Sequence, residues 1–172
     1  MTSVGSKSYW KTLWNKEAGD ETLSYVDVEN MESIETEDID EVGVYKEIAK
    51  VMGNYLVRME YKPRGMVLKR YTIDKEQRMA VLFYKYGDET IRYYMYMNSK
   101  DSSFGEKSVD DLTDEYEITT NGHNISVKEY AIKGSEQKRY TADFENKDIQ
   151  YQIKGKLKRE ELDEIIKNLF FM

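Results

Sequence analysis

The amino-acid sequence predicts an α+β fold, in which an antiparallel sheet of about seven to eight strands has two helices packed on one face. Short alternating runs with turn residues between them follow one another from residue 55 to residue 153. A helical pattern at about residues 40–53 precedes these runs, and another at about 157–170 follows them. Consecutive strands joined by short turns pair antiparallel, and the two amphipathic helices can cover one side of the sheet.

The first half of the pattern contains one helix and four strands. Val44, Ile48, Val51 and Met52 lie on one side of the helix at 40–53, and Gly53 ends it. The predicted strands are 55–61, 66–73, 79–86 and 90–98, with turns at 62–65 and 87–88.

The second half contains two hairpins and the last helix. Asn121-Gly122 lies between runs at 115–120 and 124–132, and this dipeptide favours a tight hairpin because both residues tolerate positive φ. A second hairpin joins 137–144 to 149–153, and Gly155 is expected to end it. The polar stretch 99–111 is predicted to be a loop. An apolar stripe predicts the helix at 157–170: Leu157, Leu162, Ile165, Ile166 and Leu169.

Composition excludes several classes of protein. The 172 residues suit one domain with an arm, and one His with no Cys excludes zinc fingers and iron–sulfur sites in this chain. The net charge of −7 argues against a general nucleic-acid binder, so no nucleic-acid partner is expected. No apolar run approaches the ~18 residues that a membrane span needs.

The acidic charge is concentrated near the N-terminus. Residues 17–41 hold eleven Asp and Glu and no Lys or Arg, which predicts a solvated linker or an arm that docks on a basic surface; calcium binding is a weaker alternative. Tyr9, Trp10, Leu13 and Trp14 predict a short amphipathic helix within 1–16 that packs on the main domain or anchors at a membrane interface. The predicted organisation is therefore an arm at 1–16, an acidic linker at 17–40 and one α+β domain at 41–172.

Tyrosine supplies the candidate binding residues. The chain has 15 Tyr, and alternation places Ile91 and Tyr93 on the helix-covered side of their strand. On the other side, alternate residues of the predicted strands 79–86 and 90–98 form an exposed stripe of four tyrosines, with Arg92 beside it: Tyr84, Tyr86, Tyr94 and Tyr96. Such a stripe either binds a partner or stabilises the sheet by cross-strand pairing. The basic residues on the same strands are candidates to attract the acidic arm.

No catalytic constellation stands out. His123 follows a turn glycine without a recognisable partner, and the nucleophile-elbow, phosphate-loop and dinucleotide motifs are absent from the sequence. Catalytic, cofactor-binding and metal-binding residues are therefore predicted to be none. Two carboxylates of a glycan hydrolase remain an alternative, although no local motif selects a pair among 33 acids.

A series of motifs runs from about Tyr55 to Phe170, over most of the chain. It includes an aromatic strand at 140–144, the pattern Tyr151-x-Ile-x-Gly155-x-Leu157-x-x-Glu160-Glu161-Leu162, and a helix that ends Ile166-x-x-Leu169. In their order and spacing these motifs resemble a bacterial family of domains of unknown function. Pro63-Arg64-Gly65, the Tyr84 to Ile91 hairpin and Asn121-Gly122 agree with it. Phe144 stands where many members carry Trp, which changes a core volume and no chemistry.

The resemblance implies the extracytoplasmic C-terminal domain of a membrane-anchored protein in Gram-positive bacteria, similar to anti-sigma-factor ectodomains and lipoprotein-carrier-like sensors. The expected anchor is absent from this chain, which suggests an excised ectodomain; a cytoplasmic protein is the alternative. The expected function is non-catalytic binding or sensing of a protein, peptide or cell-envelope ligand. The alternatives are the glycan hydrolase and a structural domain autoinhibited by its acidic arm.

Overall fold

The computed structural model describes residues 39–97 and 110–172, so the predicted arm, most of the acidic linker and most of the predicted 99–111 loop lie outside the described part. The described chain forms two helices, α3 (Glu41–Met52) and α4 (Arg159–Lys167). Its strands are β1 (Arg58–Met59), β2 (Val67–Asp74), β3 (Met79–Tyr86), β4 (Glu89–Met97), β5 (Asp111–Thr120), β6 (His123–Ala131), β7 (Lys138–Asn146), β8 (Ile149–Lys156) and β9 (Leu169–Phe170).

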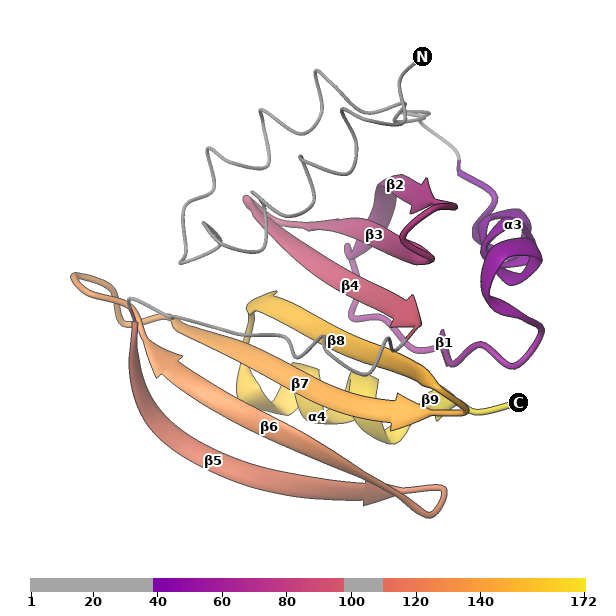
Figure 1. The fold of residues 1–172 in the computed structure, drawn as a ribbon. Coiled ribbons are helices and arrows are strands. Elements are labelled where there is room, and N and C mark those ends of the chain that lie inside the picture. Colours follow the sequence, from indigo (N-terminus) through magenta and orange to yellow (C-terminus); the bar gives the residue numbers. More distant parts are fainter. Residues whose placement is uncertain (1–38, 98–109) are drawn as a thin grey trace.

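Seven strands form one antiparallel sheet in the order β2-β3-β4-β8-β7-β6-β5. Two meanders, β2 to β4 and β5 to β8, meet at the centre of the sheet, where β4 pairs with β8 (Figure 1). β1 and β9 form a separate two-stranded sheet. The predicted α+β architecture is confirmed.

Both helices pack on the same face of the large sheet. Val44, Ile48 and Met52 of α3 share one hydrophobic core with Leu162, Ile165 and Ile166 of α4. The strands contribute side chains from alternate positions to this core, among them Leu82, Tyr93 and Ile153. Neither described helix is both long enough and apolar enough to cross a bilayer.

The start of α4 is fixed by one carboxylate. The backbone N–H of Lys158 donates to Oε2 of Glu161 at 3.1 Å, which satisfies an amide at the helix N-terminus. Oε1 of the same carboxylate accepts a hydrogen bond from the Tyr86 hydroxyl at 2.6 Å and so ties the helix to β3. The helix ends at Lys167 and not at 170 as predicted, because Leu169 and Phe170 pair with Met59 and Arg58.

The segment between α3 and β2 is mostly irregular, although the sequence predicted a strand at 55–61. Only Arg58–Met59 pairs as a strand. Val57 is fully buried, and its backbone is satisfied by two side chains: Val57 N donates to Tyr151 Oη at 3.1 Å, and Tyr93 Oη donates to Val57 O at 2.7 Å. Tyr45 Oη accepts from Met59 N at 3.0 Å.

The hairpins largely follow the predicted turns. Asn121 and Gly122 have φ of 49° and 77°, as the Asn-Gly signal requires. β5 begins earlier than predicted, at Asp111, and β8 continues through Gly155 to Lys156. Gly155 therefore does not end the hairpin. It lies inside a strand that packs closely against its neighbour.

Candidate functional site

The four predicted stripe tyrosines do not share one face, and this part of the prediction is wrong. β3 and β4 pair so that Tyr84 lies opposite Ile91. Residues directly opposite each other in an antiparallel pair point to the same side of the sheet. Tyr84 therefore joins the helix-covered side, and so does Tyr86, which follows it on the same face of the strand.

The hydroxyl of Tyr84 belongs to a partly buried polar cluster at the start of α3. It donates to Oε1 of Glu41 at 2.6 Å, and the Lys62 ammonium pairs with Oε2 of the same carboxylate at 3.1 Å. The ring of Tyr84 is fully buried, and this burial is the main reason that the pKa of Tyr84 lies well above its ordinary value. Tyr84 thus holds α3 on the sheet.

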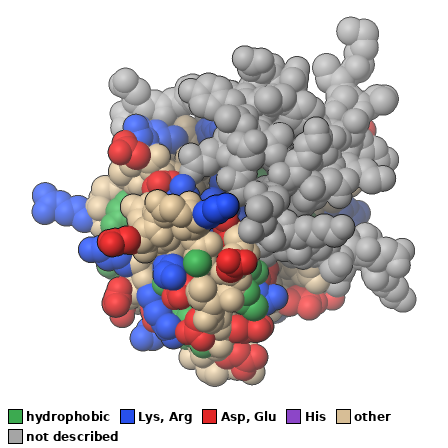
Figure 2. All heavy atoms as spheres, turned by 90° about the vertical axis from the view of Figure 1, so that its left-hand side faces the viewer, with side chains coloured by type: hydrophobic (Ala, Val, Ile, Leu, Met, Phe, Trp, Pro, Cys, Tyr) green, Lys and Arg blue, Asp and Glu red, His purple; other side chains and the backbone are tan. Residues whose placement is uncertain are grey.

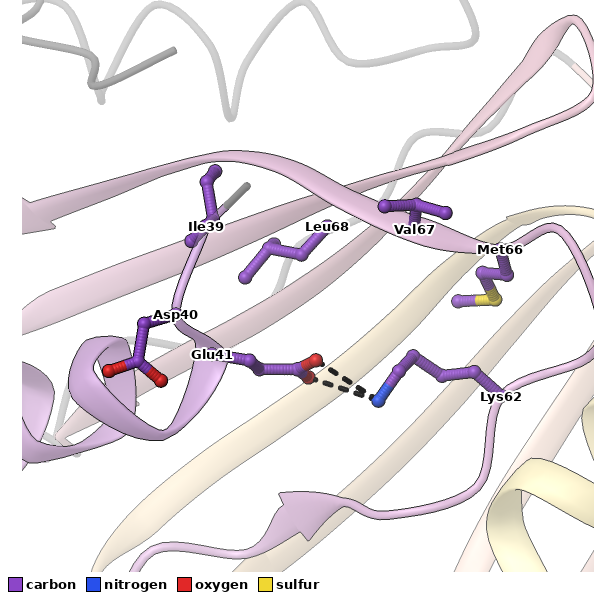
Figure 3. A pocket seen from close by; sticks show the side chains of 7 residues that line it. All are labelled: Ile39, Asp40, Glu41, Lys62, Met66, Val67 and Leu68. Atoms are coloured by element: carbon purple, nitrogen blue, oxygen red, sulfur yellow. Dashed lines mark hydrogen bonds and ion pairs between the residues drawn. The ribbon is translucent and has the colours of Figure 1, made fainter. Parts of the chain in front are cut away.

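A shallow hollow of about 430 Å³ opens beside this cluster. Its lining comes from the start of α3, the segment before β2 and β2 itself: Ile39, Asp40, Glu41, Lys62, Met66, Val67 and Leu68 (Figure 3). The Glu41 carboxylate points at Lys62, whereas the Asp40 carboxylate points away from both. The two carboxylates do not converge on one point, as the acid and base of a glycan hydrolase would.

Tyrosine hydroxyls recur as donors to carboxylates throughout the helix-covered side. Four of the pairs join a strand to a helix: Tyr71–Glu47, Tyr84–Glu41, Tyr86–Glu161 and Tyr116–Asp163. A fifth, Tyr140–Glu129, links β7 to β6. In these five pairs the tyrosine is a structural donor, which accounts for much of the unusual tyrosine content.

The hydrogen bond between Tyr140 and Glu129 leads to a prediction about how the free energy of unfolding depends on pH. The Tyr140 hydroxyl donates to Glu129 Oε2 at 2.7 Å and is the main cause that holds the pKa of Glu129 below its ordinary 4.5. A carboxyl with a lowered folded-state pKa adds stability above its unfolded pKa, and this stability is lost as pH falls through the folded pKa. We expect Tyr140→Phe to raise the pKa of Glu129 and to flatten the acid-side fall of the unfolding free energy.

Carbon-detected NMR titration of the Glu129 carboxyl checks the shift directly, and urea unfolding on both sides of pH 4.5 checks the slope. Tyr61→Phe is the control, because Tyr61 is exposed. An unchanged Glu129 pKa in Tyr140→Phe would contradict the assignment.

The face of the sheet opposite α3 and α4 carries a row of basic side chains. The strand register aligns Arg70, Phe83, Arg92, Lys154, Thr141 and Lys128 directly across six strands. We call Arg70, Arg92, Lys154 and Lys128 the basic row. Arg92 and Lys154 are directly opposite each other, and like charges in such a pair repel, so this part of the row favours an anionic neighbour. At the end of the row, Lys128 lies opposite Glu115 of β5. At the end of the sheet that faces the viewer in Figure 2, Lys and Arg are instead interspersed with Asp and Glu.

An apolar cluster adjoins the basic row on the same face. It consists of Met79, Val81, Phe83, Tyr94 and Tyr96. Tyr94 and Tyr96 lie on the face that the sequence predicted for them, but they are only 1% and 6% exposed, so the predicted open stripe is wrong for them too. The Arg70 guanidinium stacks over the Phe83 ring at 4.1 Å from its centroid and joins the row to the cluster.

Arg92 is the one predicted site residue that keeps both its predicted face and partial exposure. The sequence analysis missed Lys154, Lys128, Thr141 and Gln152 on this face. Alternation in β8 places Gln152 and Lys154 on the other face of the sheet from Tyr151 and Ile153, so the sequence did indicate which face they occupy. The pairing of β4 with β8, which brings them beside Arg92 and Tyr94, has no local signal.

Comparison with protein families assigns most of the sequence to one family. A family model described as "Domain of unknown function (DUF4367)" matches residues 56–169, from the segment before β1 to β9. The match includes every strand of the large sheet and α4, and it leaves α3 outside. Comparisons with curated proteins and with solved structures found no match. Because the family model covers more than half of the sequence, this chain belongs to the DUF4367 family of domains of unknown function.

Proposed function

We propose that this domain is a non-catalytic binding module that takes its partner on the face of the sheet opposite α3 and α4. The observation that carries the proposal is the basic row beside the apolar cluster. Protein interfaces are enriched in Arg, Tyr, Phe and Met at their centres, and the two groups supply all four residue types.

The chemistry of the face favours a protein or peptide segment that carries carboxylates and an apolar or aromatic side chain. The cations steer the acidic part and fix its register. The apolar cluster is at most 6% exposed, so it adds contact area only when the partner displaces what shields it. An extracytoplasmic, membrane-anchored setting in a Gram-positive cell, with a cell-envelope or protein ligand, is the other part of the proposal and rests on the family resemblance.

Hydrolysis of a glycan stays the alternative prediction. Among the described residues, the hollow beside Glu41 is a candidate site for it, and the two acids of this hollow are oriented apart (Figure 3). Turnover of oligosaccharides that is abolished by Glu41→Gln would revive this alternative.

Peptide display on the full chain tests the binding module. We expect the selected peptides to be rich in Asp and Glu, and we expect Arg92→Glu to weaken them at least tenfold in fluorescence anisotropy. Arg64→Glu makes the same charge change at an exposed turn residue and should leave the affinity unchanged. Affinity should fall as salt rises.

Equal affinity for Arg92→Glu and for the unmodified chain would place the site elsewhere. Selected peptides without acidic residues would contradict the assigned partner chemistry.

A further inference from the structure

The face of the large sheet opposite α3 and α4 carries an apolar cluster that is shielded from solvent, and neither of these two helices lies over it. The five side chains of the apolar cluster are at most 6% exposed. Thr141 and Gln152 beside them are each 1% exposed. Within residues 39–97 and 110–172, α3 and α4 both pack on the opposite side. A sheet face of this kind is buried only when a further layer covers it.

We propose that residues 1–38 of the same chain occupy this face, with the aromatic residues of 1–16 on the apolar cluster and the acidic residues of 17–38 along the basic row. The inference deepens the proposed function and rests on it, because the same face is then shared between this segment and a partner. The segment acts as an intramolecular competitor.

The segment joins the domain beside an edge strand of the sheet, on the side of α3. Ile39 packs against the main core and lines the hollow together with Leu68 of β2, so the segment would have to pass the β2 edge to reach the other face. β2 is an edge strand, and it pairs with β3, which carries three residues of the apolar cluster. An extended chain of 38 residues spans about 125 Å, against a width of about 30 Å for seven strands, so the segment can reach the whole face.

The composition of the segment complements the face in charge and in hydrophobicity. Residues 17–38 contain nine Asp and Glu and no Lys or Arg, so their charge is opposite to that of the basic row. Tyr9, Trp10, Leu13 and Trp14 supply the apolar area. Both tryptophans of the chain are in this group, so tryptophan emission reports on the segment alone.

Acrylamide quenching of tryptophan emission in the full chain tests the contact. We expect blue-shifted emission and a low quenching constant, both of which show buried indoles. Arg70→Glu/Arg92→Glu should raise the quenching constant at least twofold, whereas Lys46→Glu/Arg64→Glu, with the same charge change at exposed positions off this face, should not. Far-UV circular dichroism and urea midpoints verify that both variants fold.

Solvent-exposed indoles in the unmodified chain, or equal quenching in the two double variants, would overturn the inference. A displayed acidic peptide that binds the face provides the second readout, because it should raise the quenching constant as it displaces the segment. Peptide binding without this rise would overturn the competition while the proposed function stands. If the indoles are buried but display selects no peptide ligand, the proposed function is contradicted, and the contact between the segment and the sheet is purely structural.

Discussion

Tyr93→Phe is expected to lower the free energy of unfolding by about 1–3 kcal/mol, although it removes one oxygen atom and no apolar surface. The Tyr93 hydroxyl donates to the carbonyl oxygen of Val57 at 2.7 Å, and both residues are fully buried. Water cannot replace the lost donor there, so the carbonyl would remain without its hydrogen bond in the core. Urea unfolding monitored by circular dichroism measures the loss.

Tyr151→Phe gives a parallel test, because it leaves the Val57 amide without its acceptor. Tyr61→Phe is the control for the chemical change alone, since its ring is 41% exposed, and it should alter stability by no more than about 0.5 kcal/mol. If Tyr93→Phe were as mild as Tyr61→Phe, these hydroxyls would not be what holds the Val57 segment.

The sequence predicted the fold because its strongest signals are local. Period-two runs separated by Gly87-Asp88 and Asn121-Gly122 define hairpins, and the stripes of α3 and α4 define helices that need a common face. The strand predicted at 55–61 failed for a reason that is not local. Its backbone is satisfied by hydroxyls of Tyr45, Tyr93 and Tyr151, which come from one helix and two strands.

The candidate site was predicted less well than the fold. The error in the tyrosine stripe was avoidable, whereas the basic row could not be predicted from local signals. The two-residue turn at Gly87-Asp88 makes Tyr86 and Glu89 a pair, and counting back places Tyr84 opposite Ile91. The tyrosine stripe would then have split at once between the two faces. The basic row, in contrast, depends on the pairing of Arg92 with Lys154, and 61 residues separate them along the chain.

Gly155→Val is expected to be among the most destabilising single changes in the sheet, with a loss of about 1–3 kcal/mol or more. Gly155 lies within β8, opposite Tyr140, and its φ is not in the left-handed region that favours glycine. Space is what requires glycine here: an added Cβ would lie 3.2 Å from the Cα of Ile91 and would collide with its Cδ1. Ile91 is fully buried, so its side chain has little room to move away.

A double-mutant cycle separates this steric cause from a general loss of strand quality. Ile91→Val removes the Cδ1 atom that meets the new side chain, so Gly155→Ala should cost less in an Ile91→Val background than in the unmodified chain. Contacting residues of this kind typically show coupling energies of about 0.5–3 kcal/mol. If the two changes in unfolding free energy were strictly additive, glycine would be needed at this position for its backbone conformation. The strands β4 and β8 would then not approach as closely as their packing at Ile91 indicates. That approach matters for the proposed site as well, because the same two strands bring Arg92 beside Lys154 on the opposite face.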